Sequence, residues 1–415
     1  MIVRFKTIDI RQFLSNFVRI SFLITFLYLY IYNPPFAFLP LTVSKLFYIF
    51  LFPCFALNKQ LRQLFFRFFS FEFFILLVIV FYSFGIELLN GVSGNVFWGA
   101  NLFMLFENFF FTFVIAYYLN EYYKKDADVL LLVVAVIAAF ITLYLILNPS
   151  LNLQVKQSVL NSDEVSLRLQ FRCFGIADSL TFAYAIVQGI AVVLCLEKVK
   201  NVLVCSVLFL LLCISVIFNA RIGFIPILFI LFYMIFIEKR GGKVLKILLV
   251  FSIFILFFLG TDSSLDYEQT IAWATSFFQE IIDTLSDKDS GMEATNMDTL
   301  LNDMVVLPDT LMGWIWGTGE NIFSSPIHNS DIGYFIQLNY GGLIYCSFFV
   351  LLVFSLFFKL QQCKIEEKWF LYLFIVIILV CSYKGLFLIT NSGFRMLMLL
   401  YFLYFLRTKS VRQLQ

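Results

Sequence analysis

Charged residues are scarce in this sequence, and their scarcity excludes an ordinary soluble protein. Asp, Glu, Lys and Arg make up 13% of the 415 residues, and 61% of the chain is hydrophobic. A soluble globular domain has about 25% charged and about 45–50% apolar residues, so this chain has too little charge to cover a water-facing surface. The mean hydropathy of +0.92 indicates a membrane protein instead.

Histidine is also nearly absent, and the cysteines follow no recognisable spacing pattern. His328 is the only histidine, and most of the eight cysteines fall inside apolar runs, with only Cys173 expected in an outer loop. Their spacing matches no zinc pattern and indicates no disulfide framework, so we expect neither a metal nor a cofactor. No small-residue cleavage site follows the first apolar run, which predicts that this run stays as a membrane anchor.

Long apolar runs are what the sequence has in abundance. Each is roughly 18–22 residues long, enough for a helix to cross a bilayer core, and the short alternation of a β-barrel is absent. We therefore expect an all-α polytopic membrane protein, a single integral membrane domain over residues 1–415, with about twelve transmembrane helices. The predicted spans are 17–34, 40–57, 71–89, 97–119, 128–148, 178–196, 201–218, 222–237, 244–260, 333–358, 369–386 and 391–407.

Basic residues predict the orientation of these spans. Most of the 29 lysines and arginines fall in alternate loops that share one side with both termini, which indicates cytoplasmic termini. The remaining basic residues, outside or in the outer part of a span, are Lys45, Lys156, Arg168, Arg172, Arg221, Lys288, Lys384 and Arg395. Two outer loops are long: residues 149–177, and an acidic loop over 261–332. A structureless loop of the second size is uncommon, so we expect helices around 271–285 and 296–306.

Arginines on the outer side are the strongest candidates for binding a ligand. Arg168 and Arg172 are four residues apart, so one helical face could present both. Arg221 lies in a tight turn between two spans, and Arg395 lies near the start of the last span. Because a guanidinium group matches the paired oxygens of phosphate and pyrophosphate, we predict a basic pocket for a polyanionic ligand. The alternative is that these side chains extend to the membrane surface or pair with the acidic loop.

Glu107 lies near the middle of the fourth predicted span. An ionisable group at that depth is costly, so it usually faces the interior of the helix bundle or a cavity. Its position indicates a polar cavity or an ion pathway. The alternative is a structural ion pair, or a protonated carboxyl that is hydrogen-bonded to a neighbouring helix.

Polar residues gather at the end of the large outer loop. His328 could act as a general base near neutral pH, and Asp331 could cap the first turn of the span that follows. The alternative is a polar cap beside a surface histidine. The nearby GTG at 317–319 follows no strand and lacks the lysine of a nucleotide-binding loop. DKD at 287–289 has the spacing of metal-dependent sugar transferases but is interpreted as a chance match.

Three segments resemble the bacterial O-antigen polymerases, the Wzy group, which are relatives of the O-antigen ligases. They are RLQFRCFGIADSLTFAYAI, FNARIGFIPILFILF and GWIWGTGENIFSSPIHNSDIGYFIQLNYGGLI, and the closing KGLFLITNSGFRMLMLLYFLYFL also fits. The likeness lies mainly in the C-terminal part of the chain, together with the layout of many spans and one large loop. The chain lacks the arginine that the family often shows early in that loop, before the region of Trp314 and Trp316.

The resemblance implies a GT-C-like membrane glycosyltransferase of lipopolysaccharide biosynthesis, in the bacterial inner membrane with its active site facing the periplasm. It would transfer a glycan from undecaprenyl pyrophosphate to a sugar hydroxyl of a new lipid-linked repeat unit. The four outer arginines would bind the pyrophosphate, and His328 or Asp331 would lie near the acceptor as the catalytic base. The expected partners are the lipid-linked oligosaccharide, membrane lipid and a chain-length regulator, and no nucleic acid.

Other functions stay open at this point. An O-antigen ligase would share the fold and use a lipid A core as its acceptor. A polysaccharide flippase or other secondary transporter often has paired half-repeats and charges distributed through its spans. The single large outer loop and the clustered arginines argue against transport, whereas Glu107 argues for it. A structural scaffold would not need four outer arginines.

Overall fold

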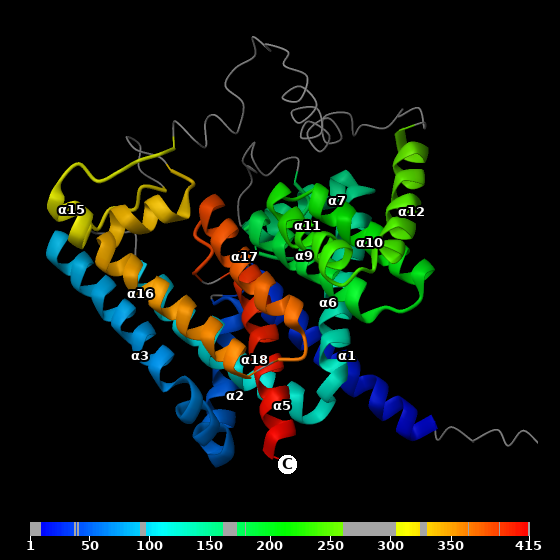
Figure 1. Ribbon diagram of the computed structural model, residues 1–415, viewed down its shortest axis with the longest axis horizontal. Helices are drawn as coiled ribbons and strands as arrows, with labels where there is room; N and C mark the ends of the chain where they lie inside the picture. The colour runs from blue at the N-terminus through cyan, green and yellow to red at the C-terminus, as the bar shows by residue number, and fades with distance from the viewer. Residues whose placement is uncertain are drawn as a thin grey trace, which may run out of the picture.

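The computed structural model describes residues 10–36, 39, 41–91, 97–160, 172–178, 180–259, 304–323, 330–363, 365–389 and 391–413. Throughout these ranges the regular structure is helical (Figure 1). The expectation of an all-α chain is therefore confirmed for the part of the protein that the structure describes.

Every apolar run that predicted a span forms helical structure. In chain order these elements are α1 (Ile10–Tyr32), α2 (Val43–Leu57), α3 (Lys59–Asn90), α4 (Phe97–Phe103) with η1 (Met104–Phe111) and α5 (Thr112–Tyr123), α6 (Ala127–Ile146), α9 (Thr181–Lys198), α10 (Val202–Ile217), η3 (Arg221–Gly223) with α11 (Phe224–Phe232) and η4 (Tyr233–Ile237), α12 (Gly241–Leu259), α16 (Gly333–Cys363), α17 (Lys368–Lys384) and α18 (Ser392–Gln413). The short η2 (Lys124–Asp126) precedes α6. Two further helices lie in the predicted outer loops: α7 (Pro149–Leu160) and α15 (Leu311–Trp316).

Helix length and composition show that the protein is membrane-embedded. Five stretches in the described ranges are long and apolar enough to cross a bilayer: Lys59–Asn90, Phe97–Tyr123, Ala127–Ile146, Thr181–Lys198 and Gly333–Cys363. Four shorter apolar helices are Phe17–Tyr32, Val43–Leu57, Val202–Ile217 and Arg221–Ile237. A helical membrane protein is thus confirmed, whereas twelve crossings and a GT-C-like arrangement stay predictions.

Helix α3 begins earlier than the sequence predicted. Its first turn starts at Lys59, between the predicted spans 40–57 and 71–89, because Asn58 caps it: Leu61 N–H donates to Asn58 Oδ1 over 3.0 Å. Leu61, Phe65 and Phe69 are fully buried. The basic residues of this segment therefore belong to a helix that packs on the core, and the hydrophobic run marks only part of its length.

Helix α16 is bent where two glycines follow each other. Gly342 has φ 68° and ψ −171°, a backbone conformation that suits glycine. The part before the bend contacts α15, and the part after it runs beside α3 (Figure 1). There the Lys359 ammonium pairs with the fully buried carboxylate of Glu72, and Ser355 donates to the same carboxylate. This ion pair fixes α16 to α3.

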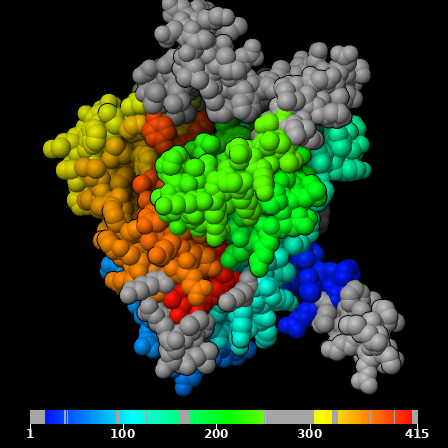
Figure 2. Space-filling model, turned by 45° about the vertical axis from the view of Figure 1, so that its right-hand side comes forward, coloured from blue at the N-terminus to red at the C-terminus, as the bar shows by residue number. Residues whose placement is uncertain are grey.

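Helices α9 and α18 form the centre of the bundle. Residues 396–405 of α18 are all buried, and α18 packs on α1, α5, α9 and α16. Helix α11 packs against α17, and Figure 2 shows the green helices beside the orange ones on one face of the molecule. Gly393 near the start of α18 lies beside Ala183 and Ile186 near the start of α9, so the irregular segments before these helices lie at the same end of the bundle.

The opposite end of the bundle contains an ionic network that we call the inner cluster: Asp128, Lys198, Glu367 and Arg407. Lys198 Nζ lies 2.8 Å from Asp128 Oδ2, and Arg407 Nη2 lies 2.5 Å from Asp128 Oδ1. Glu367 Oε1 lies 3.5 Å from both basic groups. The cluster brings the start of α6, the end of α9, the residue before α17 and the last part of α18 to the end where the chain terminates (Figure 1). These are segments that the charge pattern assigned to one side.

Candidate functional site

Non-helical segments meet at the start of α9. Asp178 N–H donates to Tyr32 O over 2.9 Å, and Tyr28 OH donates to Ile176 O over 2.9 Å, so the segment before α9 lies on the end of α1. At Gly393, near the start of α18, a Cβ would lie 3.1 Å from Ala183 O. Irregular backbone at membrane depth requires burial in protein or a polar cavity. This junction is therefore the place in the described structure where a polar site is expected.

Arg172 is held beside the first residue of α9. Its side chain is half-buried and donates from Nη1 to Thr181 Oγ1. The backbone beside it is tied to the turn between α10 and α11, because Cys173 N–H donates to Phe218 O over 3.0 Å and Asn219 Nδ2 donates to Cys173 O over 2.6 Å. Arg172 and the turn that contains Arg221 are thus joined through hydrogen bonds.

Arg221 begins that turn as the first residue of η3, and it is half-buried. The turn presses closely on α9: a Cβ on Gly223 would lie 2.5 Å from Ala185 O, and a Cβ on Gly189 would lie 2.3 Å from Gly223 O. Only glycine allows this backbone approach at both positions. The close packing places Arg221 against the same helix whose start holds Arg172.

Arg395 and Glu107 form a buried ion pair, which we call the central pair. Arg395 Nη2 lies 3.3 Å from Glu107 Oε2, and their side chains are 1% and 2% exposed. Arg395 Nη1 donates to Tyr30 O over 2.7 Å and to Ile31 O over 3.2 Å. The contact is ionic, since Glu107 Oε2 accepts no hydrogen bond from the described residues. The ion-pair alternative therefore describes the position of Glu107. Arg395 faces Glu107 and the end of α1, and its contact with pyrophosphate stays a prediction.

Glu107 lies in a π-helical turn that the sequence did not predict. The turn is η1, and it interrupts the α-helical hydrogen bonds of the fourth run. The Glu107 carbonyl accepts hydrogen bonds from Thr112 Oγ1 over 2.7 Å and from Tyr30 OH. Its carboxylate Oε1 accepts from Ser44 Oγ over 3.0 Å and from Tyr48 OH. Hydroxyl groups from α1, α2 and α5 thus hold the wide turn and its charge in place.

Asp331 lies two residues before the start of α16 and is half-buried. The hydrogen bond at this helix start comes from its neighbour, because Ile332 N–H donates to Ser330 Oγ over 3.1 Å and Ser330 Oγ donates to Met304 O over 2.7 Å. Ser330 thus holds the turn before α16, and the capping role expected of Asp331 stays a prediction. Asp331 stays available as a candidate acid or base.

The start of α16 lies close to the start of α9. A Cβ on Gly333 would lie 2.1 Å from Gly385 O, at the end of α17, and a Cβ on Gly385 would lie 3.6 Å from the ring of Phe182. The structure thus brings Asp331 and Lys384 to the junction that also holds Arg172. Arg168 and His328 lie outside the described residues, as do the helix expected around 271–285 and most of the one expected at 296–306, of which residues 304–306 are not helical.

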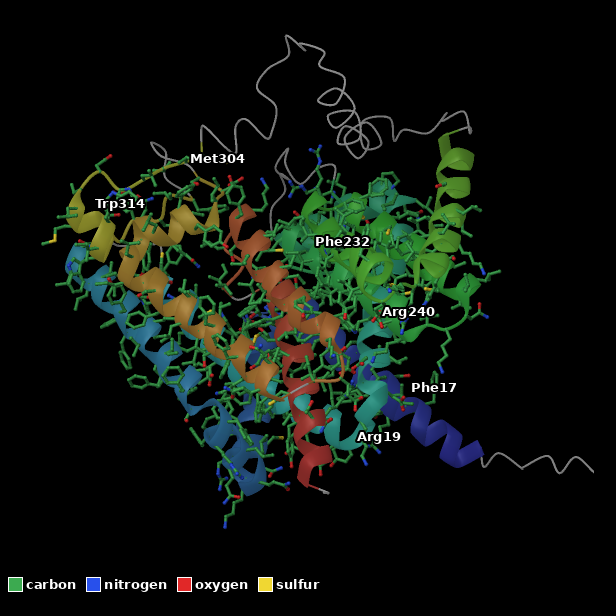
Figure 3. All side chains as sticks on the ribbon, viewed as in Figure 1. Phe17, Arg19, Phe232, Arg240, Met304 and Trp314 are labelled. Carbon is green, nitrogen blue, oxygen red and sulfur yellow. The ribbon has the colours of Figure 1, made fainter. Side chains whose placement is uncertain are left out.

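The GTG segment has a structural role in the outer part of the bundle. Thr318 N–H donates to Asn339 O over 2.7 Å and Gly319 N–H donates to Tyr340 O over 2.9 Å, so the segment pairs with the backbone just before the bend of α16. Tyr82 OH bonds to Trp316 O over 3.1 Å. Figure 3 shows Trp314 and Met304 at the end of the molecule away from Arg19. The end of the large outer loop is therefore fixed to α3 and α16.

Sequence reasoning missed Asp178, which lies in the segment between Arg172 and α9. The residue is half-buried, and Leu180 N–H donates to Asp178 Oδ1 over 3.3 Å. Burial raises the pKa of this carboxyl to about 7, although nearby Arg395 opposes the rise. The signal in the sequence was a lone acidic residue within the segment that carries two arginines.

No known protein family, curated protein or solved structure matches the chain. The class of protein thus follows from the fold and the site. It is a helical, membrane-embedded protein with half-buried arginines and carboxyl groups around the start of one central helix.

Proposed function

We propose that this protein is an O-antigen polymerase, a membrane glycosyltransferase that extends a surface polysaccharide. It transfers the growing glycan from undecaprenyl pyrophosphate to a sugar hydroxyl of a new lipid-linked repeat unit. The observation that supports this most is the arrangement of Arg172 and Arg221 against α9, at the junction with Asp331 and Lys384. A lipid-linked anion requires such a basic site in an apolar bundle.

The chemistry of the leaving group explains why arginine is suited to this site. Breaking the bond between the glycan and the carrier leaves negative charge on a pyrophosphate, and fixed donors aimed at that charge stabilise the transition state. Arg172 is held by Thr181, and the backbone of the turn that begins at Arg221 is held against α9 by its glycine contacts. Arg168 is proposed to join them.

The proposed topology follows the charge pattern. Both termini are cytoplasmic, about twelve helices cross the bacterial inner membrane, and the site faces the periplasm. The inner cluster supports this arrangement, since it gathers segments that the pattern assigned to the cytoplasmic side. A chain-length regulator in the same membrane is a proposed partner.

Substitution of the two arginines tests the proposal. We expect Arg172→Ala and Arg221→Ala to replace the long lipopolysaccharide ladder with single-repeat bands on a gel. The rate of chain growth should fall about 100-fold, which is typical when an enzyme loses a hydrogen-bond donor to the transition state. Arg172→Lys keeps the charge but not the planar fork, so it should restore the ladder only in part.

A matched control is Arg240→Ala, because Arg240 lies away from the start of α9 and pairs with Glu197 and Glu238. This variant should retain the full ladder. A full ladder from both Arg172→Ala and Arg221→Ala would reject the proposed site. Loss of even the single-repeat band would indicate an O-antigen ligase or a flippase instead.

A further inference from the structure

Asp178 occupies a position that the proposed mechanism does not yet use. It lies in the non-helical segment 172–178, six residues after Arg172 and just before the first turn of α9. Its backbone is fixed by the hydrogen bond from its N–H to Tyr32 O, and its Oδ1 is fixed by the bond from Leu180 N–H. The other carboxylate oxygen is not used by either bond. The half-exposed carboxyl is therefore held in one orientation.

Charged and titratable groups from each neighbouring element surround this carboxyl. Arg395 of α18 favours its ionised form, and Glu107 of η1 disfavours it. Helix α1 contacts the backbone of this segment, where Tyr32 O accepts from Asp178 N–H and Tyr28 OH donates to Ile176 O. Arg172 lies in the same segment and is occupied by Thr181. A single arginine thus lies between two carboxyl groups, and the one at Glu107 is the closer ion pair.

We propose that Asp178 is the base that takes the proton from the acceptor hydroxyl. This assignment rests on the function proposed above and names a residue for it in the same segment as Arg172, between that arginine and α9. It ranks Asp178 ahead of Asp331, since Asp178 belongs to the segment that holds the arginine, whereas Asp331 reaches the junction only through the packing of α16 on α17.

The proposed step balances without any further reactant. The acceptor O–H bond breaks as its proton moves to Asp178, and the hydroxyl oxygen bonds to the anomeric carbon of the donor glycan. The bond from that carbon to the pyrophosphate breaks, and its electron pair leaves on the pyrophosphate. The proton on Asp178 then passes to the departing pyrophosphate or to water.

The state of the carboxyl predicts how the rate depends on pH. Burial raises the pKa of Asp178 to about 7, and a base acts only when it is deprotonated. The rate should therefore rise as the pH increases through about 7 and level off above it. An ordinary aspartate, with a pKa of about 4, would give no such rise near neutral pH.

The experiment uses the full chain in lipid nanodiscs, with lipid-linked repeat units extracted from cells that lack the polymerase. The initial rate of chain lengthening is measured from about pH 5 to about pH 8. Asp178→Asn retains Oδ1 for the bond from Leu180, so the local structure should persist. Its rate should fall at least about 100-fold, within the usual contribution of a general base. Asp178→Glu should recover part of the rate with a shifted pH profile.

Asp309→Asn is the matched control, because Asp309 is an exposed carboxyl just before α15, and it should keep both the rate and the profile. An Asp178→Asn protein that retains the wild-type rate and profile overturns the proposal. Loss of rate in Asp331→Asn alone overturns it as well and assigns the base to Asp331. A wild-type protein that lengthens no chain at any pH rejects the proposed function itself, which is a separate outcome from failure of the Asp178 variant.

Discussion

Two of the buried carboxylates in the described structure, Asp128 and Glu107, differ in how many cations surround them. In the inner cluster, Asp128 receives both Lys198 and Arg407, whose side chains are 26% and 15% exposed. In the central pair, Glu107 faces Arg395 alone, and both side chains are almost completely buried. The first site has a spare cation and access to water, whereas the second has neither among the described residues.

This difference indicates different roles for the two sites. A charge that loses its only partner inside a protein is strongly destabilising, so the central pair makes each of its members depend on the other. It joins η1 to α18, and through Arg395 it also holds the end of α1, on which the Asp178 segment lies. The inner cluster closes the bundle with redundant contacts. The central pair positions the proposed site.

Replacing Arg395 should give the largest effect. Arg395→Ala leaves the Glu107 carboxylate uncompensated and should lower the free energy of unfolding by about 3–5 kcal/mol. Chemical unfolding of the detergent-solubilised protein measures this change. The double variant Glu107→Gln/Arg395→Met removes both charges and should recover most of the lost stability, because neutral replacement of a buried pair is often tolerated. Equal stability of Arg395→Ala and wild type would show that the pair does not brace the bundle.

Much of the fold could be predicted from the sequence, because apolar runs are a local signal. Each run forms helical structure, and burial at membrane depth requires the backbone bonds that a helix provides. Helix ends were less predictable. Asn58 starts α3 before the hydrophobic run begins, and Gly342 bends α16 within one. A side-chain cap and a positive φ each depend on a single residue. A hydrophobic run is recognised over many positions and does not show the effect of one residue.

Individual residues of the candidate site could be predicted from the sequence, but the contacts between them could not. The sequence indicated that Glu107 lies deep in a span and that Arg395 lies on the outer side, where basic residues are few. Their pairing depends on how η1 packs against α18. The π-turn was not visible either, since hydroxyls from other helices stabilise it. Asp178 is not distinguished from other loop aspartates in the sequence, and only folding makes it half-buried. Which residues distant in sequence become partners, and how far a carboxyl group is removed from water, depend on the packing of the helices.

Breaking the inner cluster at its arginine should cost less than breaking the central pair. In Arg407→Ala, Asp128 keeps Lys198 at 2.8 Å, so its charge stays compensated. We expect a loss of about 1.5–3 kcal/mol in the free energy of unfolding, which is the range for hydrogen bonds to charged groups. The same unfolding measurement compares the two arginines directly. A loss equal to that of Arg395→Ala would remove the proposed distinction between a redundant cluster and a dependent pair.

The smallest effect should come from the outermost carboxylate of the inner cluster. Glu367 Oε1 lies 3.5 Å from both Lys198 and Arg407, and its side chain is 17% exposed. Water can replace such long contacts, so Glu367→Gln should change the free energy of unfolding by only about 0–1 kcal/mol. Added salt should reduce the difference from wild type further, because screening acts mainly on exposed pairs. A large, salt-independent loss would mean that Glu367 is as dependent on its partners as Glu107, and the inner end would then brace the bundle as strongly as its centre.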